Sequence, residues 1–139
     1  MTSRTLLAAA LGTALAAAPA MAQVTDQHFR SGRTGDLAVL CGAAASDPMH
    51  TAALNWCQGF IVGAGQYHAS IAEAGGSHKP LFCLPTPEPT LEQARVAFVA
   101  WARAHPQYAA ERAVDGLSRF AAETWPCPAT KPLGRPARR

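Results

Sequence analysis

Four cysteines, Cys41, Cys57, Cys83 and Cys127, constrain how this 139-residue chain can fold. None has the CxxC spacing of a zinc or redox motif. An even number of cysteines in a small exported chain indicates disulfides, because exported domains of this size have modest cores and meet an oxidising environment. Whether the chain is exported therefore decides how these residues are interpreted.

The first residues indicate export. Arg4 precedes an apolar run from Leu6 to Ala18, and the small-residue site Ala20-Met21-Ala22 follows it. The run is shorter than the roughly 20 residues needed to span a bilayer. We therefore expect residues 1–22 to be a secretory signal peptide cleaved after Ala22, with a retained membrane anchor as the alternative. The remaining chain is then expected in the periplasm.

The apolar spacing of the rest is helical, which predicts an all-α domain over residues 23–128. We expect four main helices in a small disulfide-stapled bundle, with a short extra helix near residues 26–32. The first main helix is predicted within residues 33–45 with Thr34 as its N-cap, and the second over residues 52–74. In the second, Gly59 and Gly63 are expected to mark close packing inside the domain rather than a dimer contact.

The other two helices have recognisable start signals. Thr90 and Gln93 form a capping-box pattern that begins the third helix. Pro106 suits the first turn of the fourth, which is expected to end before Trp125. The basic stretch 129–139 is rich in proline and is predicted to be a disordered tail.

This layout favours one of the three disulfide connectivities. An antiparallel hairpin of the first two helices brings Cys41 beside Cys57, and an antiparallel pair of the last two brings Cys83 beside Cys127. Pairing of Cys57 with Cys83 remains open, because the intervening loop is just long enough to double back. In the favoured pairing Cys127 is a structural staple.

No catalytic or metal-binding motif is visible. The histidines are scattered, without the spacing of a zinc site, and a cysteine nucleophile would need a free thiolate beside one of them. Twelve basic residues against nine acidic ones give no nucleic-acid signature. We expect a binding protein rather than an enzyme, with no metal, cofactor, nucleic acid or small-molecule substrate. The five histidines are His28, His50, His68, His78 and His105.

From Phe29 to Cys127 the chain resembles the Rap/Tai family of periplasmic immunity proteins for type VI secretion amidase effectors. The resemblance is carried by the spacing of Cys83-Leu84-Pro85, Thr90 with Gln93, His105-Pro106 and Trp125-Pro126-Cys127. It implies a small, disulfide-bonded, all-helical protein, often a homodimer. It also implies binding to a cognate peptidoglycan amidase, whose active cleft is blocked.

The segment between the second and third helices is the candidate contact with such a partner. Its glycines permit a sharp exit from the helix and Cys83 anchors its far end. An ordinary interhelical loop is the competing interpretation. The residues expected to reach outward are Ser77, His78, Lys79, Leu81 and Phe82.

Two other functions remain open. A small periplasmic stress chaperone could loosen when its histidines are protonated and then bind many clients. A cell-wall-associated module could instead use the basic tail, Lys131 to Arg139.

Overall fold

The computed structural model describes residues 22–72 and 78–128. Five α-helices and one 3₁₀ turn make up the regular structure, and within these residues there is no β-strand. The helices run in the order α1 (His28–Ser31), α2 (Thr34–Cys41), α3 (His50–Ala72), α4 (Leu91–Ala104) and α5 (Ala113–Thr124), with the 3₁₀ turn η1 (Pro106–Tyr108) between the last two. The predicted all-α class, with four main helices and a short first one, is confirmed.

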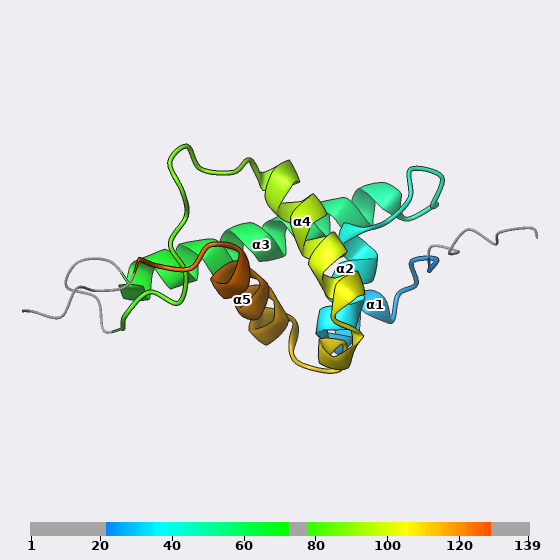
Figure 1. The fold of residues 1–139 in the computed structure, drawn as a ribbon. Helices are drawn as coiled ribbons and strands as arrows, with labels where there is room; N and C mark the ends of the chain where they lie inside the picture. Colours follow the sequence, from blue (N-terminus) through cyan, green and yellow to red (C-terminus); the bar gives the residue numbers. More distant parts are fainter. Residues whose placement is uncertain (1–21, 73–77, 129–139) are drawn as a thin grey trace, which may run out of the picture.

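The short helix α2 is the centre of the fold. It packs against α1, α3, α4 and α5, so a helix of only eight residues is surrounded on all sides (Figure 1). Leu37, Leu40 and Cys41 of this helix are completely or almost completely buried. They meet Phe98 of α4 and Cys57 of α3 in a single hydrophobic core. Burial of each large side chain contributes roughly 1.5–3 kcal/mol.

The long helix α3 extends beyond this core. Only Ala53 and Cys57, both in its first half, are buried. The segment that leads to α4 crosses its second half, and the chain that leaves α5 runs alongside the same half (Figure 1). None of the helices in the described ranges is long and apolar enough to cross a membrane.

Both favoured disulfides are present, so the connectivity predicted from the sequence is confirmed. Cys41 pairs with Cys57 and Cys83 with Cys127. The first bridge fastens the end of α2 to α3. The second fastens the segment before α4 to the residues after α5. The two bridges therefore hold different parts of the molecule.

The expected N-cap of α2 is wrong by one residue. Arg33 is the cap, and its N–H donates to the Asp36 carboxylate at 3.3 Å. Thr34 is instead the first residue of the helix and is buried, where its Oγ1 donates to the carbonyl of Arg112 at 3.1 Å. A tertiary hydrogen bond has taken the hydroxyl that the sequence pattern assigned to local capping.

The fourth main helix also begins later than predicted. Pro106 opens the 3₁₀ turn η1, and α5 starts only at Ala113. The reason is tertiary, because the carbonyls of Ala109 and Glu111 accept hydrogen bonds from Gly35 and Thr34 at 2.9 and 2.8 Å. Together with the hydrogen bond from the Ala113 N–H to the Gly32 carbonyl at 2.8 Å, these bonds hold residues 109–112 in a non-helical path.

The interpretation of Gly59 and Gly63 is wrong as well. A Cβ added at either position would meet no atom within 4 Å, and both residues are exposed. Close packing within the domain therefore does not explain them. By contrast, Gly116 of α5 is buried directly against Thr34. The close approach of α5 to α2 occurs at Gly116, which is not part of a GxxxG pair in the sequence.

Candidate partner-binding site

The segment that follows α3 is fixed by main-chain hydrogen bonds at both ends. The N–H of His78 donates to the carbonyl of Ile71 in the last turn of α3, at 3.0 Å. The N–H of Cys83 donates to the carbonyl of Trp125, just after α5, at 2.9 Å. The disulfide from Cys83 to Cys127 reinforces the second attachment. Residues 78–83 are thus held between α3 and the end of α5.

His68 of α3 supports the middle of this segment. Its Nε2 accepts a hydrogen bond from the N–H of Leu81 at 3.0 Å. Its ring also stacks on Phe82, with the centroids 3.9 Å apart and the planes 14° from parallel. Because a main-chain N–H can only donate, Nε2 must carry a lone pair and the ring proton must be on Nδ1. His68 is thus a half-buried histidine whose ring is both hydrogen-bonded and stacked.

The structure separates the predicted contact residues into two groups. His78, Lys79 and Leu81 are exposed, with 61% of Leu81 accessible to solvent. Phe82 is half-buried and turns toward His68 instead of reaching outward, which differs from the expectation. Ser77 lies outside the described residues.

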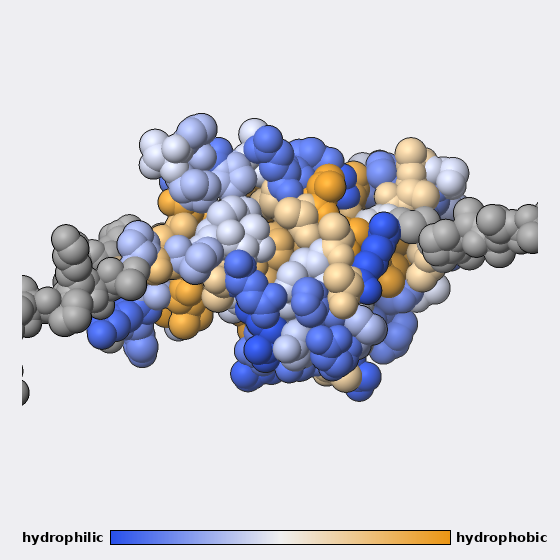
Figure 2. All heavy atoms as spheres, viewed as in Figure 1, coloured by the Kyte–Doolittle hydropathy of each residue, from blue (hydrophilic) through white to orange (hydrophobic). Residues whose placement is uncertain are grey.

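Beside this segment is a cavity of about 310 Å³ that the sequence did not predict. It lies between the second half of α3, the segment leading to α4 and the end of α5, where Figure 2 shows apolar side chains gathered. Its size is at the lower end of the range for ligand pockets, and apolar groups dominate its walls. The residues that line it include Val62, Gly65, Phe82, Leu84, Glu88 and Trp125.

One sequence signal could have pointed to this cavity. Gly65 lies inside a long helix, where glycine costs about 0.5–1 kcal/mol relative to alanine. A Cβ at Gly65 would meet no atom within 4 Å, so crowding does not require the glycine. Gly59 and Gly63 of the same helix are equally uncrowded but do not line the cavity, so glycine alone does not single out this position. Which other segments would surround it could not be deduced from the sequence.

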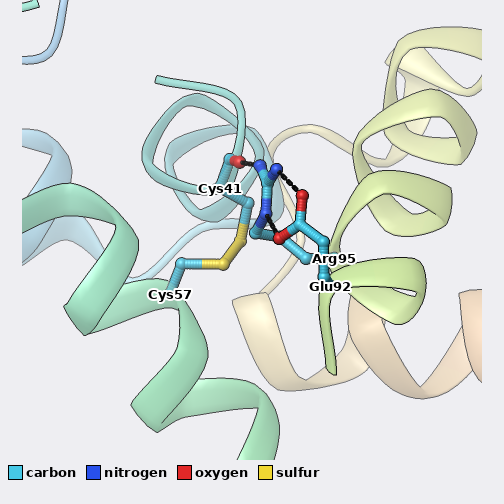
Figure 3. The surroundings of a disulfide bond; sticks show 4 residues. All are labelled: Cys41, Cys57, Glu92 and Arg95. Atoms are coloured by element: carbon cyan, nitrogen blue, oxygen red, sulfur yellow. Dashed lines mark hydrogen bonds and ion pairs between the residues drawn. A yellow bond between two sulfur atoms is a disulfide. The ribbon is translucent and has the colours of Figure 1, made fainter. Parts of the chain in front are cut away.

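Arg95 and Glu92 of α4 lie in the surroundings of the Cys41–Cys57 disulfide (Figure 3). Arg95 of α4 reaches the carbonyl of Cys41 and also forms a bidentate ion pair with Glu92, at 2.5 and 2.7 Å (Figure 3). The hydrogen bond from Arg95 lowers the pKa of the Glu92 carboxyl, and Glu92 in turn raises the pKa of Arg95. This arrangement neutralises the end of α2 and joins it to α4.

Neither bridge provides a reactive group. All four cysteines are oxidised, and no group of three or more His, Cys, Asp or Glu suited to a metal ion occurs in residues 22–72 and 78–128. Among these residues the site offers exposed apolar surface, a fixed main chain and a cavity. Such an arrangement can bind a macromolecular partner.

A family of proteins described as Rap1a immunity proteins matches residues 33–127. This chain belongs to the Rap1a immunity protein family. The Rap1a match begins at the N-cap of α2 and ends at Cys127, so it includes both disulfides. No curated protein and no solved structure matches the chain.

The limits of the Rap1a match coincide with structural boundaries. The anchored segment and every wall of the cavity lie inside residues 33–127, whereas α1 and the docked residue Val24 precede the match. Membership in this family implies an immunity function toward an effector protein. The two disulfides fit an oxidising compartment.

Proposed function

We propose that this protein is a periplasmic immunity protein that binds one peptidoglycan amidase delivered by type VI secretion and blocks its active cleft. The family match supports the immunity role, and the resemblance of residues 29–127 to Rap/Tai proteins supports the choice of an amidase. The protein acts by occupancy and needs no catalytic group of its own.

The observation that carries this proposal is the fixed, exposed segment after α3. Leu81 presents an apolar side chain to solvent while its main chain is bonded to His68. Cys83 holds the far end through a disulfide. A segment that is already ordered loses less conformational entropy on binding, so more of its contact energy becomes affinity. An inhibitor that enters an enzyme cleft needs this property.

The expected signal peptide and the oxidised cysteines both bear on the cellular location. We propose that residues 1–22 are a signal peptide removed on export and that the folded domain works in the periplasm, where the amidase would reach its substrate. The oxidised cysteines agree with that compartment. The basic residues 129–139 are proposed to be an accessory tail that is dispensable for binding.

Binding and inhibition can be measured with the exported protein, purified from the periplasm with its disulfides formed. The probe is each peptidoglycan amidase effector encoded in the same genome, tested by calorimetry and by cell-wall hydrolysis. We expect one amidase to bind saturably and to lose its activity at equal stoichiometry. Binding to none of them would overturn the proposal, and acid-induced binding of many clients would favour the chaperone alternative.

A pair of exposed apolar residues tests the location of the contact. Leu81→Glu should weaken amidase binding by roughly tenfold or more, because it places a charge in a desolvated interface. Val96→Glu is the matched control, since Val96 is similarly exposed at 52% but lies on α4. Equal effects of the two substitutions would contradict a contact at the anchored segment.

A further inference from the structure

The cavity beside α3 has a distinct chemical character. Its walls include Val62 and Leu84, each 43% exposed, together with Phe82 and Trp125. Apolar side chains that remain this accessible around a concave surface are typical of a binding site for another apolar group.

Gly65 keeps the cavity open from the α3 side. It lies one turn after Ile61 and three residues after Val62, so it occupies the same face of the helix. Gly65 is itself one of the lining residues, and a Cβ added there would meet no atom within 4 Å, so a larger side chain can be placed at the cavity wall without crowding the rest of the chain. Of the three uncrowded glycines of α3, Gly59, Gly63 and Gly65, Gly65 is the one that lines the cavity.

A single carboxylate sets the polarity of the rim. Glu88 is the one charged residue among the described residues that line the cavity. It is exposed, and no ion pair joins it to a basic side chain within the described part of the chain. The cavity is therefore complementary to an apolar group that carries a positive charge nearby.

The cavity is also continuous with the proposed contact segment. Phe82 belongs to both, because it follows the exposed Leu81 and lines the cavity wall. A partner that covers Leu81 would therefore meet the cavity next. The two form one surface that includes a central pocket, the arrangement in which binding energy concentrates on a few anchor residues.

We propose that this cavity receives a large apolar side chain of the bound amidase, and that a lysine or arginine of the same amidase segment pairs with Glu88. The inference rests on the proposed function, since it identifies where that partner is anchored. The cavity lies outside the expected outward-reaching residues, apart from Phe82 at its edge. In this proposal residues 78–83 enter the cleft of the amidase, and the cavity beside them receives a side chain from the amidase.

Filling the cavity from its own helix is the decisive test. Gly65→Leu should lower affinity for the amidase by roughly tenfold or more, because the new side chain takes the place of the partner's anchor. Gly59→Leu is the matched control, as Gly59 is on the same helix, has an equally open Cβ position and does not line the cavity. Both variants should melt no lower than the original protein, since leucine favours helix more than glycine.

The charge is tested separately at an exposed position that leaves the core untouched. Glu88→Lys should weaken binding by roughly tenfold, and Glu88→Gln should weaken it less and flatten its dependence on salt. Asp26→Asn is the control, because Asp26 is an exposed carboxylate that does not line the cavity. Its affinity should remain within roughly twofold of the original.

The outcomes separate this inference from the function on which it rests. If the original protein binds no amidase, both are overturned. If it binds and inhibits one, but Gly65→Leu and Glu88→Lys bind as tightly as their controls, only the cavity inference is overturned. If Gly65→Leu converts a dimer to a monomer in sedimentation while amidase affinity is unchanged, a second copy fills the cavity and the inference is again wrong.

Discussion

Arg95 of α4 donates a hydrogen bond to the main-chain carbonyl of Cys41, the last residue of α2. The Arg95 side chain is only 15% exposed, whereas its ion-pair partner Glu92 is 60% exposed. The hydrogen bond joins α4 to the end of α2. It also places a positive charge at a helix C-terminus, where the charge is stabilising.

Removing the Arg95 guanidinium should therefore cost more than removing its carboxylate partner. Arg95→Met keeps most of the apolar stem and should lower the free energy of unfolding by about 1.5–3 kcal/mol. Glu92→Gln should cost clearly less than Arg95→Met, because exposed ion pairs contribute little. Urea denaturation of the oxidised protein measures both values. Equal losses would mean that the ion pair, rather than the carbonyl contact, is the important interaction.

Gly116 and Gly59 should respond in opposite directions to the same substitution. A Cβ at Gly116 would lie 2.8 Å from the Cβ of Thr34, inside normal contact distance. Gly116→Ala should destabilise the protein by about 1–3 kcal/mol through overpacking. Gly59→Ala should stabilise it by about 0.5–1 kcal/mol, because its Cβ would meet nothing. Thermal melts of the two variants test the sign, and a stable Gly116→Ala protein would contradict the close packing of α2 and α5.

The two disulfides should differ in what their loss affects. On the chain-entropy estimate, sequence separations of 16 and 44 residues correspond to about 3 and 4 kcal/mol of stability. Replacing Cys83 and Cys127 by alanine should also release the segment before α4 and weaken amidase binding. Replacing Cys41 and Cys57 should lower stability while leaving the affinity of the folded fraction nearly unchanged. Calorimetric binding, corrected for the folded fraction, distinguishes these cases.

Acid should release the docked N-terminal residues by protonating Asp47. The Asp47 carboxylate accepts hydrogen bonds from the N–H groups of Val24 and Met49, both at 2.8 Å, which lowers its pKa. A group whose folded pKa is depressed contributes stability above its unfolded pKa, near pH 4 for aspartate, and loses it as the pH falls through the folded value. The protection factor of the Val24 amide, corrected for the intrinsic pH dependence of exchange, should therefore fall at low pH.

Asp47→Asn is the control for that pH dependence. It removes the titrating group, so the protection factor of the Val24 amide should be lowered already at neutral pH and should change little on acidification. A variant that retains the full acid-induced loss of Val24 protection would show that another group is responsible.

His68 should control the order of the contact segment. His68→Phe keeps an aromatic ring against Phe82 but removes the acceptor for Leu81 N–H, so amide exchange at Leu81 should rise by roughly tenfold. His68→Ala should raise it further, because the stacking is lost as well. No change at Leu81 in His68→Phe would contradict the role of this hydrogen bond.

Local signals determined most of the secondary structure. The capping box predicted at Thr90 and Gln93 is present, with hydrogen bonds of 2.8 and 3.2 Å between the two residues. The cysteine pairing was also predictable, since helix order brings Cys41 to Cys57 and Cys83 to Cys127. These features depend on residues near in sequence or on the order of the helices. The spacing of apolar residues along the sequence indicates that order.

Contacts between distant segments decided the rest. α5 starts later than the sequence predicts because the carbonyls of Ala109 and Glu111 accept hydrogen bonds from the start of α2. At the same contact the buried Thr34 hydroxyl donates to the Arg112 carbonyl instead of capping its own helix. The cavity exists because α3, the segment after it and α5 meet around Gly65, where no side chain fills the space. A sequence specifies which helices form through local hydrogen bonds and apolar spacing. The volume left between packed helices depends on all of their side chains together, so only the tertiary structure could reveal it.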